Sequence, residues 1–414
     1  MRTVHLLRKL DPAEWGGTET AIQRLFAGLR EQGVTPVAYC PRLESRPAQE
    51  PPQWEWEVQR FRSFVPVWGI SKERKDQMVA VGGNLMSYQL VAALWRERQA
   101  ALIHTHTLGR IGGIGRTVAK RRGLPFVVSI HGGVLDLPAD LKASFNAPVD
   151  GGWEWGKLFG WLFQSHRLFS DADAIITCND KEAALLQQRY PAKRVVVQPH
   201  GVPLALYQQD HRAEARAAFP QIAERPVLLN VGRIDPVKNQ SWLLDRAPVI
   251  FQKHPRLLLV LAGACTDRPY GELIGRKIEQ LGLRDRVLLT GGLPPNDPRL
   301  IGLLQEAAAV VLPSVSETFG LVILEAWAAG AAVLSSRASG PAALVQSGHN
   351  GWLFDLDRPE TFHEGLDRIL GDASLARQMA RRGAEVSRQY GVGVLAGRVK
   401  RLYEELIEER LCAT

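Results

Sequence analysis

The segment PVLLNVGRIDPVKNQ (residues 226–240) joins an apolar run, a glycine turn and the start of a helix. The apolar run 226–232 predicts a buried strand, and Gly232 allows the backbone to turn sharply after it. Arg233 and Lys238 follow on the loop, just before a helix that we expect to begin near Asn239. In open α/β sheets, ligands bind beyond the carboxyl ends of the strands. The two cations are therefore candidates for binding phosphate, with solvent-exposed charges as the alternative.

The same alternation of strand and helix patterns runs through the whole chain, in two series. The first series of predicted strands is 2–7, 35–40, 101–105, 125–130, 174–178 and 194–198. The second is 226–232, 257–263, 286–291, 308–313, 331–336 and 351–354. Alternating strands and helices predict parallel sheets covered by helices. We therefore expect two Rossmann-like domains, 1–200 and 201–390, with 391–414 as a C-terminal helix that returns to the first. Residues 43–70 and 132–152 are predicted to be irregular.

Composition and charge narrow the class of protein. The 414 residues carry a net charge of +8 and are 45% hydrophobic, as expected for a globular enzyme of two domains. We find no apolar run long enough to span a membrane, no signal peptide and no paired cysteine spacing, which predicts a cytoplasmic protein. Residues 1–200 hold 26 Lys and Arg against 19 Asp and Glu, so 26 − 19 = +7 of the charge lies there. Much of this excess comes from Arg96, Arg98, Arg110, Arg116, Lys120, Arg121 and Arg122. This excess favours peripheral contact with an anionic membrane or acceptor, with a solvated basic face as the alternative; we predict no nucleic-acid partner.

The segment SETFGLVILEAWAAG (316–330) predicts a buried helix, with Thr318 as N-cap and Gly330 as its stop. Glu325 is its only charged residue. It is either an ordinary surface side chain or a carboxylate directed at ligand hydroxyls. Glu317 precedes the helix by one residue of loop, and eight helical residues rise about 12 Å. The two glutamates could thus hold opposite ends of one extended ligand.

Two features of the first half are candidates for the ligand side of its sheet. Gly16 and Gly17 precede a helix that we expect Thr18 to cap; they could admit a phosphate to its N-terminus, or form a plain turn. His131 follows the strand 125–130 and is predicted to face the ligand. His104 and His106 lack a third ligand at matching spacing, so no metal is predicted.

Three other patterns are open to a structural interpretation. The Asp-x-Asp pairs Asp171/Asp173 and Asp355/Asp357 resemble metal-diphosphate motifs, but their positions favour structural roles. The aromatic segment 151–169 fits either a membrane- or acceptor-facing element or a core helix, and we favour the core helix.

Taken together, these residues resemble the retaining glycosyltransferases of family GT4, which have the GT-B fold. The resemblance covers nearly the whole chain. It rests on Gly16–Gly17, IHGG with His131, GRIDPVKN with Arg233 and Lys238, the Glu317-to-Glu325 element and a looser GHNGWLF. The chain departs from the family at His200, where Asn is usual, and at Ala343, where Glu is common. These departures bear on the family subtype and the choice of donor but touch no core chemistry.

The resemblance implies two Rossmann-like domains that face each other across a cleft holding a nucleotide-diphosphate sugar. Arg233 and Lys238 would neutralise the diphosphate, which Gly17 would contact, and His131 would lie near the reacting carbon. Glu325 would bind the ribose hydroxyls, and Glu317 the sugar. The implied donor site also includes Gly16, Gly232, Thr318, Phe319, Gly320 and Leu321.

The implied activity is retaining transfer of a hexosyl group to an acceptor hydroxyl, without metal or cofactor. The implied acceptor is a glycan or glycolipid, in cell-envelope polysaccharide, lipopolysaccharide or lipid-linked glycan synthesis. The alternatives are a GT-B protein that binds nucleotide sugars without transferring them, and a nucleotide-sugar epimerase.

Overall fold

The computed structural model describes residues 1–10, 16–42, 55–72, 74–75, 78, 85–131 and 153–412. The chain divides into two units: unit 1 is Met1–Pro199 with Gly393–Thr414, and unit 2 is His200–Val392. Our predicted boundaries, after residues 200 and 390, lie within two residues of these divisions. The predicted irregular stretches 43–54 and 132–152 lie outside the described residues, as do the two glycines that follow His131.

Unit 1 contains a seven-stranded sheet in the order β3-β2-β1-β5-β6-β8-β9, and all its strand pairs are parallel. The strands are β1 (Arg2–Leu6), β2 (Thr35–Arg42), β3 (Glu57–Arg62), β5 (Ala100–Thr105), β6 (Phe126–Ile130), β8 (Ala174–Thr177) and β9 (Val195–Val197). A separate antiparallel pair joins β4 (Val67–Trp68) to β7 (Trp153–Glu154). The helices are α1 (Gly17–Glu31), α3 (Tyr88–Arg96), α4 (Gly109–Arg122), α6 (Lys157–Leu162), α7 (Leu168–Asp171), α8 (Asp180–Arg189) and α18 (Val392–Cys412), with a 3-10 turn η3 (Ser165–Arg167).

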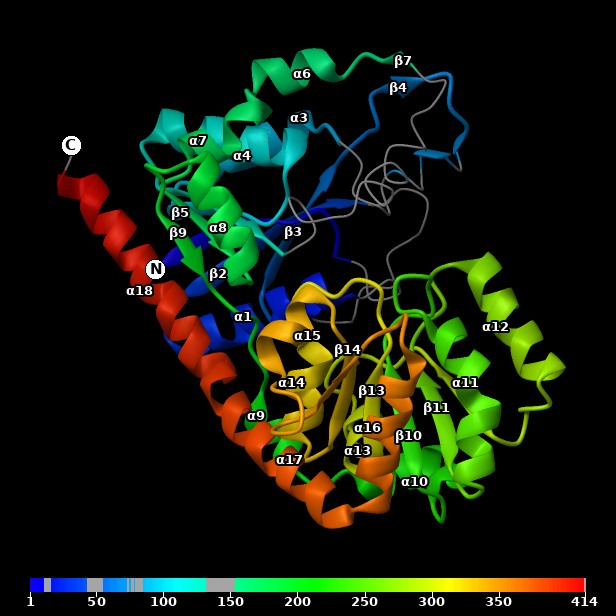
Figure 1. The fold of residues 1–414 in the computed structure, drawn as a ribbon. Coiled ribbons are helices and arrows are strands. Elements are labelled where there is room, and N and C mark those ends of the chain that lie inside the picture. The colour runs from blue at the N-terminus through cyan, green and yellow to red at the C-terminus, as the bar shows by residue number, and fades with distance from the viewer. Residues whose placement is uncertain are drawn as a thin grey trace. The chain divides into compact units, whose positions relative to one another are not determined.

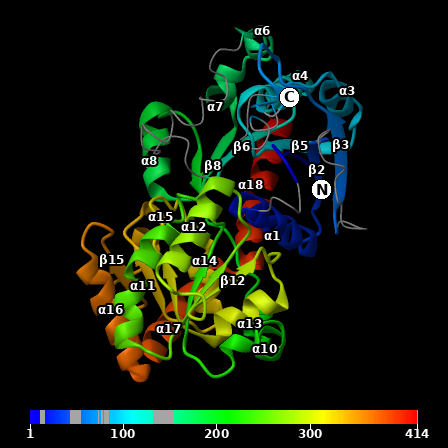
Figure 2. The same cartoon turned by 90° about the vertical axis from the view of Figure 1, so that its right-hand side faces the viewer.

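Two layers of helices cover this sheet. Alternate side chains of the central strands point to opposite faces. Ile103 and Val128 pack with α3 and α4, whereas Leu102 and Val127 pack with Leu402 and other residues of α18. Figure 2 shows α18, in red, beside α1 and the strands of unit 1. The last helix of the chain thus completes the core of the first unit.

Unit 2 contains a six-stranded parallel sheet in the order β12-β11-β10-β13-β14-β15 (Figure 1). The strands are β10 (Val227–Val231), β11 (Leu258–Ala262), β12 (Val287–Gly291), β13 (Ala307–Leu312), β14 (Val333–Ser336) and β15 (Trp352–Phe354). The helices are α9 (Leu204–Gln208), α10 (Arg212–Ala218), α11 (Gln240–Lys253), α12 (Arg268–Gln280), α13 (Pro298–Glu306), α14 (Leu321–Ala328), α15 (Ser339–Leu344), α16 (Pro359–Gly371) and α17 (Ala373–Ser387), with 3-10 turns η4 (Pro220–Ile222) and η5 (Arg388–Tyr390). This order is that of a doubly wound dinucleotide-binding fold.

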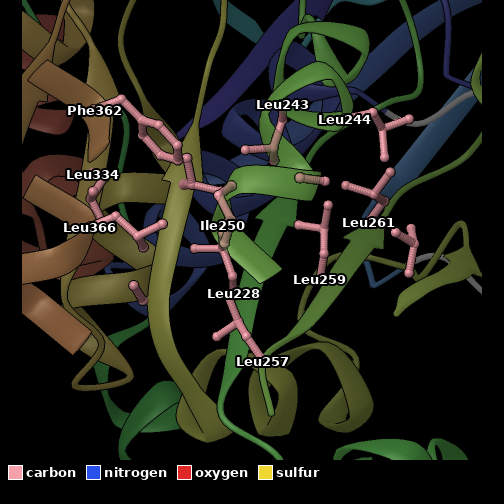
Figure 3. Close-up of a cluster of buried hydrophobic side chains, with 14 of the residues drawn as sticks. Leu228, Leu243, Leu244, Ile250, Leu257, Leu259, Leu261, Leu334, Phe362 and Leu366 are labelled. Carbon is pink, nitrogen blue, oxygen red and sulfur yellow. The ribbon is translucent and has the colours of Figure 1, made fainter. Parts of the chain in front are cut away.

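The core of unit 2 lies between its sheet and the helices on one face. Figure 3 shows Leu228 and Leu259 of the sheet pointing toward Leu243 and Ile250 of α11. Burying a leucine side chain fully contributes about 1.5–3 kcal/mol, so this layer stabilises the packing of α11 on β10 and β11.

The twelve predicted strands are all present, but three local predictions were wrong. β3 lies inside the stretch predicted to be irregular. Helix α1 begins at Gly17 with Gly16 as its N-cap, whereas Thr18 was predicted to be the N-cap. Helix α14 begins at Leu321 after Gly320, which has φ +92°, not after Thr318. A glycine adopts this left-handed conformation without the strain that a Cβ atom adds, so it can turn the chain into the helix. Gly330 does follow the end of α14, with φ +84°.

Candidate active site

In both sheets the strand order reverses at one point, between β1 and β5 in unit 1 and between β10 and β13 in unit 2. Loops that leave such a point diverge to opposite faces of the sheet and leave a crevice for ligands. The predicted site residues fall at these two places. Gly16, Gly17 and His131 belong to unit 1, and the remainder to unit 2.

The loop after β10 carries the two predicted cations. Backbone bonds from Gly232 to Ala262 and from Ile234 to Ala264 hold this loop against the end of β11. Gly232 has φ +156°, and a Cβ atom built on it would lie 3.4 Å from the Lys238 side chain. Glycine at this position therefore lets the lysine stem pack over the turn.

Each cation is paired with a carboxylate. Arg233 forms an ion pair with Asp235 at 3.0 Å, and its side chain is 48% exposed. Lys238 donates from Nζ to Oε2 of Glu317 at 2.5 Å, and both side chains are less than a quarter exposed. Asp235 also accepts the backbone N–H of Lys238. Asp235 was absent from the predicted site, although it stands two residues after Arg233.

A backbone bond explains how Glu317 reaches Lys238 across 79 residues of sequence. Val315 donates its N–H to the carbonyl of Val237 at 2.9 Å, which ties the loop after β13 to the loop after β10. The carbonyl of Glu317 accepts the N–H of Gly340 at 2.8 Å. A Cβ atom on Gly340 would lie 2.5 Å from the nitrogen of Phe319, so the start of α15 packs directly on this loop.

Glu325 lies inside α14 and is 7% exposed. The alternative of an ordinary surface glutamate is therefore wrong. Thr318, Phe319 and Gly320 precede the helix, and Leu321 is its first residue. The N-terminus of a helix carries a partial positive charge and N–H groups that favour anions or oxygen-rich ligands.

In unit 1, a cavity of about 330 Å³ lies at the carboxyl ends of β1, β5 and β6. It is lined by Leu7, Arg8, Lys9, Thr18, Glu19, Ile22, His106, Thr107, Leu108, Gly109, Ser129, Ile130 and His131. Gly16 lies at the start of α1, where its N–H donates to the carboxylate of Glu19 at 3.1 Å. A Cβ atom on Gly17 would meet nothing within 4 Å, so the space beside this residue is open.

Buried histidines lie on the α1/α18 face of this sheet, next to the cavity. The ring nitrogens of His5 and His106 lie 3.0 Å apart, and those of His106 and His131 lie 2.9 Å apart. His104 contacts the hydroxyls of Tyr403 at 2.6 Å and Ser129 at 2.7 Å. Burial lowers the pKa of His131 to about 4. It also lowers the pKa of His5 and His104 well below 6.5, helped by neighbouring histidines.

Within the described part of the chain, His5, His104 and His106 form the one group close enough to share a metal ion. Both ring nitrogens of His5 and of His104 already take part in hydrogen bonds. A metal ion would have to displace at least one of these bonds in a buried place. We therefore interpret the group as a hydrogen-bonded cluster. Its third member, His5, lies 99 residues before His104, and no spacing rule would have found it.

The contacts of Asp171, Asp173 and Asp355, from the two Asp-x-Asp pairs, agree with structural roles. Asp171 pairs with Arg116 of α4, and Asp173 pairs with Arg410 of α18. Asp355 pairs with Arg337 and Arg358.

Comparisons with known proteins follow the same division of the chain. Residues 16–233 match the model for the glycosyl transferase 4-like domain, and residues 211–386 match that for glycosyl transferases group 1. The chain belongs to the glycosyl transferase 4-like family. It is a glycosyltransferase of the GT-B fold, as the sequence predicted.

Relatives and solved structures of this family are similar over most of the chain. The D-inositol 3-phosphate glycosyltransferase of Segniliparus rotundus is 27% identical over 375 residues, which is 89% of this chain and 80% of the relative. The enzyme of that name from an Arthrobacter species is 27% identical and covers 91% of this chain and 87% of the relative. Anabaena Alr3699/HepE, solved with UDP and glucose, has a TM-score of 0.71 at 18% identity, with 98% and 100% of the two chains covered. Sucrose-phosphate synthase from Thermosynechococcus elongatus has a TM-score of 0.74 at 21% identity, with 99% of each chain covered.

Proposed function

We propose that this glycosyltransferase transfers a hexosyl group with retention of configuration, from a nucleotide-diphosphate sugar to an acceptor hydroxyl, without a metal ion. The observation that carries the proposal is the grouping of Arg233, Lys238 and Glu317 at the carboxyl edge of the unit 2 sheet. All three come from loops that leave the point where strand order reverses.

The chemistry follows from where charge develops. As the bond to the sugar breaks, negative charge collects on the leaving diphosphate and positive character on the sugar. Arg233 and Lys238 would stabilise the diphosphate, each held in place by a carboxylate. Glu317 is engaged by Lys238 and is therefore poorly suited to attack the sugar as a nucleophile. A same-face mechanism, in which the leaving diphosphate helps to deprotonate the acceptor, fits this arrangement better than a double displacement.

The remaining donor contacts are proposed by position. Glu325 would bind the ribose hydroxyls, and Glu317 with the backbone of 318–321 would hold the sugar. In unit 1, Gly16 and Gly17 would contact the diphosphate and His131 the sugar. Related folds solved with UDP and with UDP-glucose support UDP-glucose as the first donor to test.

The proposed acceptor is a glycan or glycolipid of the cell envelope. A phosphorylated polyol is a second candidate, because the curated relatives act on D-inositol 3-phosphate by name. Arg8 and Lys9 on the unit 1 cavity also favour an anionic acceptor.

The experiment is a transfer and hydrolysis screen over UDP-, GDP-, ADP- and dTDP-sugars, with inositol phosphate and lipid-linked acceptors. NMR of the product would report the anomeric configuration, and an inverted product would refute retention. Thermal stabilisation by a nucleotide diphosphate without turnover of any donor would favour the binding protein. Change of sugar configuration without transfer would favour the epimerase.

We also propose peripheral contact with an anionic membrane through unit 1, on grounds that differ from the sequence prediction. Arg110 and Arg116, part of the predicted basic surface, are buried and paired with Glu154 and Asp171. They are therefore not available to lipid. Among the described residues, no helix combines the length and apolar character needed to cross a bilayer.

The aromatic segment provides the new grounds. For residues 151–169 we favoured a core helix over a membrane- or acceptor-facing element. Phe159 and Phe163 do pack against the unit 1 core, but α6 has no fully buried residue. This helix has six residues, fewer than two turns, and is too short to bury both faces. Five large apolar side chains here are 58–71% exposed, and we call them the aromatic surface: Trp68, Trp153, Leu158, Trp161 and Leu162. Exposed Trp and Leu beside the exposed Lys157 match the composition of interfacial membrane contacts.

Cosedimentation with vesicles tests this contact. The chain should bind vesicles with anionic lipid more than neutral ones, and high salt should release it. Trp161→Ser should weaken binding, whereas Leu289→Ser, at a site 49% exposed in unit 2, should not. Equal loss in both variants would refute the assignment to the aromatic surface.

A further inference from the structure

A chain of hydrogen-bonded side chains runs from the middle of β1 to His131. The hydroxyl of Thr3 lies 2.9 Å from Nε2 of His5. Nδ1 of His5 lies 3.0 Å from Nε2 of His106, and Nδ1 of His106 lies 2.9 Å from Nε2 of His131. Thr3 and His5 are fully buried, and His106 is 9% exposed. The chain ends at the cavity of unit 1, which His106 and His131 both line.

Each link of this chain needs one proton. A neutral imidazole has one nitrogen that donates and one that accepts. The lowered pKa values of His5 and His131 mean that these rings are neutral at pH 7. His106 lies between these two rings and is 9% exposed; if it is neutral as well, all N–H groups must point the same way. Either all three protons are on Nδ1, directed toward His131, or all three are on Nε2, directed toward Thr3. A mixed arrangement leaves one link with two protons or none, which is costly in a buried place.

Thr3 decides between the two directions. If His5 donates to Thr3, the threonine hydroxyl must give its own proton to another acceptor. Among the described residues, His5 is the only side chain recorded in a hydrogen bond with that hydroxyl. If Thr3 donates to His5, its proton is used, and the spare donor becomes the N–H at Nδ1 of His131. This atom is buried, but its residue lines the cavity, where an oxygen of the substrate can accept the hydrogen bond. The direction toward His131 is therefore favoured.

We propose that Thr3, His5 and His106 are positioning residues that hold His131 as the Nδ1–H tautomer. Nε2 of His131 then accepts a hydrogen bond from Nδ1–H of His106. The neutral ring can donate a second hydrogen bond, from Nδ1–H, to the substrate. A donor suits an oxygen of the sugar or of the leaving group. This consequence for catalysis rests on the proposed function, in which His131 contacts the sugar; the tautomer itself does not.

The direct test is the tautomer. The full chain would be labelled with ¹⁵N-histidine, and long-range ¹H–¹⁵N spectra recorded between pH 5.5 and 8. The signals of the three rings among the ten histidines would be assigned with His5→Gln, His106→Gln and His131→Gln. All three should show the Nδ1–H pattern across this range. An Nε2–H or doubly protonated ring among them would overturn the proposal.

The second test changes Thr3, the residue at the end of the hydrogen-bonded row that lies farthest from His131. Thr3→Val removes the hydroxyl at similar volume, and the three rings should lose their single pattern. With UDP-glucose or the donor found by screening, kcat should fall about two- to tenfold, with the donor KM unchanged. Thr3→Ser, which keeps the hydroxyl, should behave as the wild type.

Thr177→Val is the matched control. Thr177 is a fully buried threonine of β8 in the same sheet, and its hydroxyl donates to Glu182. This variant should lower the melting temperature about as much as Thr3→Val without changing the histidine spectra or kcat. If Thr3→Val changes only the melting temperature, the hydrogen bonds from Thr3 to His131 only stabilise the fold, and the proposal fails. If the wild type turns over no donor, the proposed function fails, while the spectra still decide the tautomer.

Discussion

The ion pair between Lys238 and Glu317 makes a quantitative prediction about catalysis. Each group holds the other at the site: Nζ lies 2.5 Å from Oε2, with the side chains 20% and 17% exposed. Lys238→Met removes the cation that we propose faces the leaving group, and it leaves the Glu317 carboxylate without this ion pair. Glu317→Gln removes the carboxylate and frees the lysine to leave its position. Part of the loss in kcat/KM should therefore be common to the two single variants.

The magnitude follows from the kind of bond. A hydrogen bond to a charged group contributes about 1.5–3 kcal/mol, and removing one partner of such a pair strands the other. The coupling energy in a double-mutant cycle should be of that size. The double variant should then lose about 10- to 150-fold less in kcat/KM than the product of the two single losses. Glu317→Gln should act mainly on kcat, because geometry and charge change at the sugar during the reaction.

The assay is a set of initial rates over a donor titration, with melting curves to check the fold of each variant. Lys253 and Asp367 form a control pair in the same unit, 2.7 Å apart and more exposed. Lys253 ends α11, so it lies at the opposite edge of the sheet from the carboxyl ends. Lys253→Met and Asp367→Asn should leave kcat/KM unchanged, singly and together. Additivity within about 0.5 kcal/mol at Lys238 and Glu317 would show that the pair does not act as a unit.

Four further predictions follow from the same contacts. Glu325→Gln should raise the donor KM about 10- to 100-fold with a smaller effect on kcat, because ribose does not react; a loss confined to kcat would place Glu325 at the sugar instead. EDTA should leave turnover unchanged, and restoration of a lost activity by Mn²⁺ or Mg²⁺ would refute the electrostatic account. The lowered pKa values of His5, His104 and His131 stabilise the fold above about pH 6.5. That stability is lost as pH falls toward 4, by up to about 1.4 kcal/mol per histidine and pH unit, which urea unfolding against pH measures, with the exposed His166→Gln as control. Tyr403→Phe should cost about 1–3 kcal/mol, because it leaves a buried nitrogen of His104 without its hydroxyl partner; an unchanged melting temperature would contradict this.

Most of the fold could be predicted because buried parallel strands are short apolar runs. β10 and β11 are buried at every residue, and apart from Asn230 of β10 their sequences consist of Leu, Val and Ala. β3 could not be predicted in the same way. It lies at the edge of its sheet, and its sequence EVQRFR alternates polar side chains with partly buried ones. The sequence pattern of such an edge strand does not differ from that of a loop, because the strand depends on its pairing with β2.

The charges show where local reasoning fails. The count of Lys and Arg in residues 96–122 treated every cation as exposed. Arg110 and Arg116 instead find partners 44 and 55 residues later in the chain. A charge that is paired in the folded state cannot be distinguished from a free one by composition, because the partner is set by the packing of α4 against its neighbours.

The candidate site was predicted one residue at a time, and its pairings were not. Arg233, Lys238, Glu317 and Glu325 were each singled out by their place relative to a strand or helix. The pairing of Lys238 with Glu317 depends on β10 and β13 being neighbours in the sheet. The sequences of the two segments do not predict that strand order.

In both units, polar side chains from distant parts of the sequence come into contact where strand order reverses. This arrangement limits which substitutions such a site tolerates. In unit 2, the neighbours at the reversal are β10 and β13, and the residues that meet there are 79 positions apart. In unit 1, they are β1 and β5, and His5 meets His106 across 101 positions. A substitution at one member of either pair therefore removes a contact of the other member, and the sequence around that residue does not reveal the contact. Positions next to the reversal should tolerate change only in pairs, and the cycle on Lys238 and Glu317 measures how strongly one such pair is bound together.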